Sequence, residues 1–130
     1  MPLLIAAAIL FAALPAHAQV TTAAELVAKS LGISGDVAII TANPTVGTTA
    51  AKVLKLAPAR VEVVAINLST NACYIAPTAA VSSTNGILLA AGGGSVTIEV
   101  NDDLTLPTQS WWAVCAAASS QLYTQELDLQ

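Results

Sequence analysis

Apolar and polar residues alternate along much of this chain with the period of β-strands. The clearest case is residues 95–100, where every second residue is apolar: Val96, Ile98 and Val100. Successive side chains of a strand point to opposite faces of a sheet. The pattern therefore predicts a strand with one face in the core and one face in water.

Further short runs, rich in apolar and β-branched residues, are separated by proline, glycine and asparagine. We expect these runs to form strands at residues 37–41, 51–56, 60–68, 72–76, 87–89, 111–117 and 121–129. Residues 60–68 are nearly all apolar after Glu62, which is typical of a central strand. The sequence therefore predicts an all-β fold, an antiparallel β-sandwich of about seven or eight short strands.

The first 18 residues differ from the rest of the chain. They are apolar from Leu3 to Leu14 and end in the small-residue sequence Ala16-His17-Ala18. This pattern is typical of a secretory signal peptide cleaved before Gln19, although no lysine or arginine precedes the apolar run. The alternative is an apolar arm that is retained and lies against partner subunits or a membrane surface. About 12 apolar residues are fewer than the roughly 20 that a membrane-spanning helix requires.

Residues 19–34 are predicted to form a short amphipathic helix or docking arm. Thr22 and Glu25 have the spacing of a capping box, and Gly32 supplies a stop after a helix over about residues 23–31. The chain is therefore divided into an apolar leader (1–18), this helix or arm (19–34) and a β-sandwich domain (35–130).

Composition narrows the classes of function. Hydrophobic residues make up 55% of the chain and charged residues only 9%, against the usual roughly 25% charged. The surface must therefore be formed largely by uncharged polar residues, which suits an extracellular protein or a subunit packed among others. The net charge is −4, and the four basic residues cannot form a stripe that neutralises many phosphates: Lys29, Lys52, Lys55 and Arg60. Nucleic-acid binding is therefore not expected.

Residues suited to catalysis or metal binding are scarce. The single histidine, His17, lies in the apolar leader, so neither a Ser-His-Asp site nor a zinc site is expected in the β-domain. The acidic residues Asp102 and Asp103 lack the spacing of a calcium loop and are interpreted as a solvated turn. Asn67-Leu68-Ser69 matches a glycosylation sequon and is interpreted as a polar turn. We expect no cofactor and predict that the protein is not an enzyme.

Two cysteines and two tryptophans are the remaining candidates. Cys73 and Cys115 lie on different predicted strands, so a disulfide can form if these strands are neighbours; two buried thiols are the alternative in a protein assembled in the cytoplasm. Trp111 and Trp112 are adjacent on one strand and must point to opposite faces. One of them should lie in the core, and the other, together with Tyr74, is a candidate contact surface.

The segment from Arg60 onward resembles a pattern found in small virion proteins of tailed bacteriophages. In that pattern an aromatic-containing strand follows a turn with Asn, and a Gly-rich loop precedes an alternating strand. The matching residues are Asn67, Tyr74, Val81, Gly86, Leu88, 92–94 and 96–100. The resemblance implies a β-sandwich that decorates a capsid or attaches to a tail or fibre, with no catalytic residues.

The hypothesis from sequence is a non-enzymatic structural protein of a bacteriophage virion that forms homo-oligomers or binds other virion proteins. Its expected contacts are the N-terminal arm and exposed strand edges, and the apolar segment from Leu3 to Leu14 provides a candidate membrane contact. The alternative is an exported bacterial β-sandwich, periplasmic or secreted, that binds carbohydrate or a protein partner through an exposed tryptophan.

Overall fold

The computed structural model describes residue 32 and residues 36–130 of the chain. The predicted leader (1–18) and the predicted helix (23–31) lie outside the described residues. Within the described part, no helix is long and apolar enough to cross a membrane.

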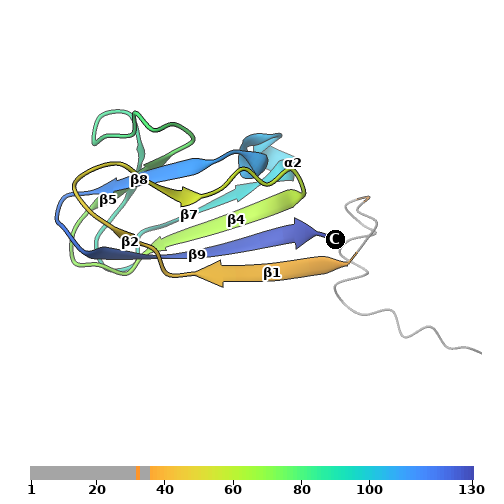
Figure 1. Ribbon diagram of the computed structural model, residues 1–130, viewed down its shortest axis with the longest axis horizontal. Helices are drawn as coiled ribbons and strands as arrows, with labels where there is room; N and C mark the ends of the chain where they lie inside the picture. Colours follow the sequence, from red (N-terminus) through yellow and green to blue (C-terminus); the bar gives the residue numbers. More distant parts are fainter. Residues whose placement is uncertain (1–31, 33–35) are drawn as a thin grey trace, which may run out of the picture.

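Two antiparallel sheets make up the described part of the chain (Figure 1). The first sheet has the strand order β1-β9-β4-β7, and β2 pairs with the beginning of β9. The second sheet has the order β3-β8-β5-β6. The strands of the first sheet are β1 (Val37–Ala42), β2 (Thr45–Val46), β4 (Arg60–Asn67), β7 (Ser95–Glu99) and β9 (Ser120–Leu129). Those of the second are β3 (Ala51–Leu54), β5 (Cys73–Ala76), β6 (Ile87–Leu89) and β8 (Trp111–Cys115).

The two sheets pack face to face around one hydrophobic core. The first sheet contributes Val46, Val63, Ala65, Ile98 and Leu122. The second contributes Leu54, Ile75, Leu89, Trp111 and Ala113, together with both cysteines. Burial alternates along β8, as expected when one face of each sheet is turned to the other. The arrangement confirms the predicted all-β fold of two antiparallel sheets.

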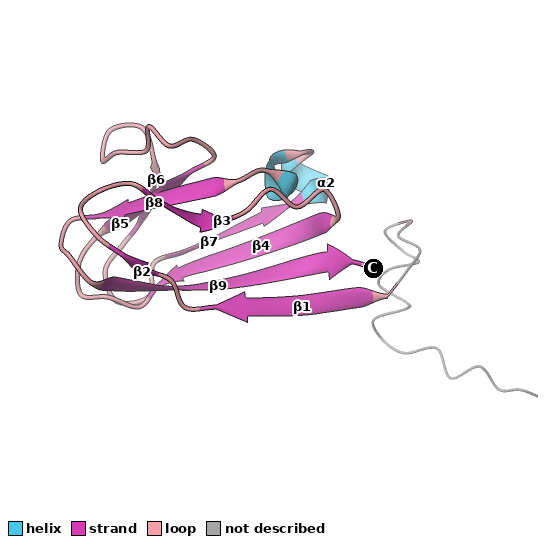
Figure 2. Ribbon diagram, in the orientation of Figure 1, coloured by secondary structure: helices cyan, strands magenta, loops and turns pink. Residues whose placement is uncertain are grey.

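Helical structure in the described residues is confined to the link between β7 and β8 (Figure 2). It comprises the short helix α2 (Val100–Asp103) and the 3-10 helix η1 (Leu106–Thr108). The prediction that Val100 continues the core face of the preceding strand is wrong, because Val100 begins α2 and its side chain is exposed. The predicted solvated turn at Asp102 and Asp103 is one helical turn. The periodicity of a strand cannot show where the backbone leaves the sheet.

The strand over residues 51–54 has an irregular register against β8. Lys52 lies opposite Trp112, and Leu54 lies opposite Trp111, so the pairing shifts between them. This irregularity turns Leu54 into the core while Lys52 stays exposed. The imperfect alternation of the sequence at this strand reflects that local shift.

Arg60, at the start of β4, is a buried cation that composition did not predict to be in the core. Its side chain is 1% exposed. Its guanidinium donates hydrogen bonds to three backbone oxygens, those of Pro107 at 2.9 Å, Gln109 at 3.1 Å and Lys55 at 2.5 Å. Its Nε lies 2.6 Å from Oε2 of Glu126 on β9. Arg60 therefore ties the first sheet to the loop after β3 and to η1.

Candidate interaction site

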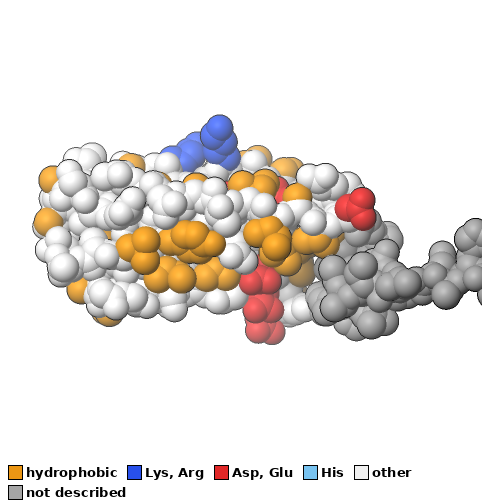
Figure 3. Space-filling view, turned by 90° about the horizontal axis from the view of Figure 1, so that it is seen from below, with side chains coloured by type: hydrophobic (Ala, Val, Ile, Leu, Met, Phe, Trp, Pro, Cys, Tyr) orange, Lys and Arg blue, Asp and Glu red, His pale blue; other side chains and the backbone are white. Residues whose placement is uncertain are grey.

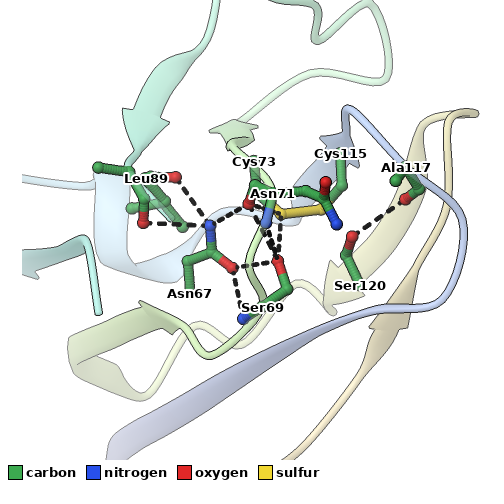
Figure 4. The surroundings of a disulfide bond; sticks show 9 residues. Asn67, Ser69, Asn71, Cys73, Leu89, Cys115, Ala117 and Ser120 are labelled. Carbon is green, nitrogen blue, oxygen red and sulfur yellow. Dashed lines mark hydrogen bonds between the residues drawn. A yellow bond between two sulfur atoms is a disulfide. The ribbon is translucent and has the colours of Figure 1, made fainter. Parts of the chain in front are cut away.

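The two cysteines are joined in a disulfide within the second sheet (Figure 4). Cys73 on β5 and Cys115 on β8 lie directly opposite each other in the strand register, with their Cα atoms 4.0 Å apart. Both residues are buried in the core. The structure thus confirms the predicted disulfide, and it places the bond in the scaffold, away from solvent.

A hydrogen-bond network around Asn67 lies next to this disulfide (Figure 4). The Asn67 side chain is fully buried, and its Nδ2 donates to the carbonyl oxygens of Asn71 at 2.7 Å, Leu89 at 2.9 Å and Ala90 at 3.2 Å. Its Oδ1 accepts bonds from the backbone N–H and the hydroxyl of Ser69. The side-chain amide of Asn67 therefore stabilises the turn before β5 through these hydrogen bonds. This agrees with the interpretation of the sequon as a polar turn.

Trp111 does not belong to a contact surface. Its side chain is 1% exposed in the core, and its Nε1 donates a hydrogen bond of 3.1 Å to the carbonyl oxygen of Leu106. It had been a candidate contact residue together with Trp112. The structure corrects that assignment, because the strand register turns Trp111 toward the first sheet.

Trp112 and Tyr74 lie on the outer face of the second sheet and are half-buried. The Nζ of Lys52 lies 4.9 Å from the centre of a Trp112 ring, in cation–π geometry. Tyr74 borders an open hollow of about 570 Å³, whose lining consists of apolar and hydroxyl side chains, among them Thr48, Thr49, Val81, Ser82 and Val114. Among the described residues, no group of three or more His, Cys, Asp or Glu is placed to hold a metal ion.

The edge strand β1 carries the most exposed isoleucines of the described residues. Ile39 is 66% exposed and Ile40 is 45% exposed, on opposite faces of the strand. Among the described residues β1 pairs with β9 alone, so within this part of the chain its other side is an open sheet edge. Figure 3 views the molecule from the side on which β1 lies and shows a band of hydrophobic side chains there. We call the open side of Val37–Ala42 the β1 edge.

A second group of exposed apolar side chains lies at the α2–η1 corner. Leu104, the residue after α2, is 73% exposed, and Val100 and Leu106 are exposed beside it. Leu104 has a φ of +54°, a positive value that residues with a side chain rarely adopt. This backbone conformation costs of the order of 1 kcal/mol of conformational free energy, and it occurs at a residue whose apolar side chain points into water.

Like charges meet on the outer face of the first sheet. Glu62 on β4 lies directly opposite Glu99 on β7. Burial of its carboxyl group, and secondarily the charge of Glu99, raise the pKa of Glu62 above its ordinary value. The negative charge of Glu62 is therefore unfavourable in the folded protein, because its carboxyl group is partly buried and faces the charge of Glu99.

Comparisons with known proteins leave the family of the chain open. No protein-family model matches it, and no curated protein matches it. A solved structure from Bacillus endospore appendages, described as disulfide-linked pili, is 13% identical with a TM-score of 0.43, over 73% of this chain and 88% of that one. A dTDP-4-dehydrorhamnose 3,5-epimerase from Bacillus anthracis, solved with TDP and PPi, is 15% identical with a TM-score of 0.40, over 81% of this chain and 60% of that one. Likenesses this weak assign neither a family nor an activity.

The sequence did not single out Ile39 and Ile40. Their run, VAIITA, is easily identified as a strand, and its lack of charged residues could have marked it as unusual for a sheet edge. The position of a strand at an edge depends on long-range pairing, here with β9 near the end of the chain. That pairing leaves no local signal in residues 37–42.

Proposed function

We propose that this protein is a structural subunit, not an enzyme, and that it acts through protein–protein contacts in an assembly of several chains. The observation that carries the proposal is the β1 edge, where Ile39 and Ile40 are exposed beside backbone that no described strand pairs with. Exposed apolar side chains on an open strand edge are features of interaction surfaces. A partner that covers them removes both from water.

The setting implied by the sequence resemblance is a bacteriophage particle, in which the subunit decorates a capsid or joins a tail or fibre. The disulfide between Cys73 and Cys115 favours a second setting, an exported bacterial assembly. Disulfides form and persist in oxidising compartments and are rare in proteins that fold and remain in the cytosol. The leader-like residues 1–18 fit the same route of export.

A protein partner fits the surface better than a carbohydrate. Sugar rings usually stack on a free aromatic face, whereas the ring of Trp112 already has the Lys52 ammonium 4.9 Å from its centre. Trp111, the other tryptophan, is in the core. In the part of the chain that the structure describes, the large exposed apolar side chains are aliphatic, which suits packing against another protein.

Light scattering and intact mass of the full chain, expressed with export to an oxidising compartment, test the proposal. We expect a particle mass that corresponds to more than one chain. A strictly monomeric protein over the whole accessible concentration range contradicts the proposal.

The intact mass separates the two settings. A mature chain beginning at Gln19 supports the exported assembly and contradicts the virion. An uncleaved chain that begins at Met1 supports the virion and contradicts export through a cleaved signal peptide.

A further inference from the structure

Three of the four sheet edges carry features that discourage pairing with another chain, and the β1 edge does not. β3 has Lys52 and an irregular register, β6 has only 3 residues, and β7 ends in Glu99. Charged side chains, bulges and short length are the usual ways in which proteins protect a sheet edge. β1 has 6 residues, and none of them is charged or a proline. Its edge is the one at which a further strand can be added.

The hydrogen bonds around β1 show which of its backbone groups face outward. The carbonyl oxygen of Asp36 accepts from the N–H of Gln130, and that of Pro44 accepts from the N–H of Leu122, so the even-numbered residues of this strand point their backbone groups at β9. In an antiparallel pair, alternate residues point their N–H and C=O groups to the other side. Val37, Ile39 and Thr41 therefore present theirs at the open edge.

These outward-facing groups are symmetric about Ile39. If a second copy approaches the edge around a two-fold axis at Ile39, Val37 lies opposite Thr41 of the other copy and Ile39 lies opposite its own equivalent. Each outward N–H then meets an outward C=O, and none is left over along the strand. The edge is thus complementary to itself, which is the requirement for a two-fold interface.

The side chains fit the same register. Ile39 meets Ile39 of the other copy on the outer face, and Ile40 meets Ala38 of the other copy on the opposite face. The nearest acidic residue, Asp36, lies opposite Ala42, so no like charges face each other across the new pair. The chain has a net charge of −4, and this strand adds no charge to the contact between two copies.

We infer that β1 of one copy pairs antiparallel with β1 of a second copy, centred on Ile39, and joins their first sheets into one continuous sheet. The inference rests on the proposed function and names the partner as this same chain. It requires no segment other than the strand that the structure describes, and it buries the two most exposed isoleucines of the described residues.

Single cysteines in the full chain test the register. Residues in a hydrogen-bonded antiparallel pair have Cα atoms about 5.5 Å apart, within the range of a disulfide. Under a glutathione redox buffer, Ile39→Cys should therefore cross-link most chains into dimers. In Ile40→Cys each cysteine lies opposite Ala38 of the other copy, so the two cysteines are two residues out of register and beyond the roughly 7 Å limit. Leu88→Cys, 55% exposed on β6, measures cross-linking by random collision.

Cross-linking of Ile39→Cys well above both other variants supports the inference. Equal cross-linking of Ile39→Cys and Leu88→Cys overturns it, and so does preferential cross-linking of Ile40→Cys.

A charge placed on the edge tests the same interface without cysteines. Ile39→Lys should shift the protein from dimer or larger assembly to monomer in light scattering, whereas Leu88→Lys, with the same added charge on β6, should leave the mass unchanged. If the two variants assemble alike while the wild type is oligomeric, the inference is wrong and the proposed function stands. A wild type that is monomeric contradicts the proposed function itself.

Discussion

The two sheets of this molecule differ in their edge strands. The second sheet has short strands, a disulfide between its central pair and edges protected by Lys52 or by the brevity of β6. The first sheet has the longest strand, β9, of 10 residues, and ends in the uncharged β1 edge. The second sheet is cross-linked between its two central strands and protected at both edges, whereas the first sheet has an unprotected edge at β1. The contrast separates the scaffold from the contact surface.

The first sheet also extends beyond the cover that the second provides. Ile40 and Thr124 point to the same inner face of the first sheet, because Ile40 pairs with Glu126, two residues from Thr124 on β9. Thr124 is fully buried, yet Ile40 is 45% exposed. The inner face at β1 therefore has no facing sheet, which explains why Ile40 is in contact with water. Ile39 is exposed because it lies on the outer face.

The largest expected loss of stability follows from replacing Arg60, whose buried side chain links the first sheet to η1. Arg60→Ala removes the ion pair with Glu126 and leaves Glu126 and Asp128, which are largely buried, without their cation. Breaking a buried pair in this way should lower the free energy of unfolding by about 4 kcal/mol. Urea denaturation measures the change. Lys55→Ala, which alters an exposed side chain nearby, is the control and should change it by less than about 0.5 kcal/mol.

Loss of the disulfide is expected to weaken the second sheet to a slightly smaller degree. The bond closes a loop with a sequence separation of 42 residues, for which chain entropy gives about 4 kcal/mol as an upper value. We expect Cys73→Ala/Cys115→Ala to be less stable by about 3 kcal/mol in urea denaturation. Wild type measured with a reductant should match the double variant. Equal stability of oxidised and reduced protein would show that the bond is not a main support of this sheet.

The third-largest loss of stability is expected when the hydrogen-bond network of Asn67, beside the disulfide, is removed. Asn67→Ala removes the three hydrogen bonds that the buried Nδ2 donates to the carbonyl oxygens of Asn71, Leu89 and Ala90. The expected loss of stability is about 2 kcal/mol. Ser82→Ala, in an exposed turn with its own side-chain hydrogen bonds, is the matched control and should cost much less. A loss no greater than that of the control would refute a structural role for the buried amide.

The smallest expected effect is a pH dependence on the outer face of the first sheet. The pKa of Glu62 is raised in the folded protein by burial and by Glu99, so folding favours the protonated carboxyl. The contribution of Glu62 to stability is therefore fully present below the ordinary value of 4.5 and is lost as the pH rises through the raised pKa. Glu62→Gln should remove this part of the pH slope and stabilise the protein at pH 7 by roughly 0.3 kcal/mol. An unchanged slope in thermal unfolding between pH 4 and pH 7 would contradict it.

Most strands could be predicted from the sequence because their signals are local. Alternation and turn residues predicted the strand at residues 87–89 with the same bounds, and placed the others to within a few residues. They also predicted that Trp111 and Trp112 point to opposite faces. Which tryptophan enters the core depends on how β8 lies between β3 and β5, and that is decided by long-range pairing.

The features missed from the sequence depend on tertiary contacts. β2 has 2 residues, too few for a periodic pattern, and it is formed by pairing with β9. The burial of Arg60 could not be predicted, because only the folded chain brings the carbonyl oxygens of Pro107 and Gln109 around it. The structure indicates β1, and not the tryptophans, as the main candidate contact site. This could not be predicted, because only the folded sheet shows which strand lies at its edge.

Amide hydrogen exchange at β1 tests the central claim most directly. In Ile39→Lys, taken as the monomer, the backbone N–H groups at position 39 and of Thr41 should exchange rapidly, while that of Ile40, bonded to β9, should be protected. In the assembled wild type, all of them should be protected. Equally rapid exchange of the Ile39 and Thr41 amides in assembled wild type and in Ile39→Lys would contradict the claim that a second copy continues the first sheet at β1.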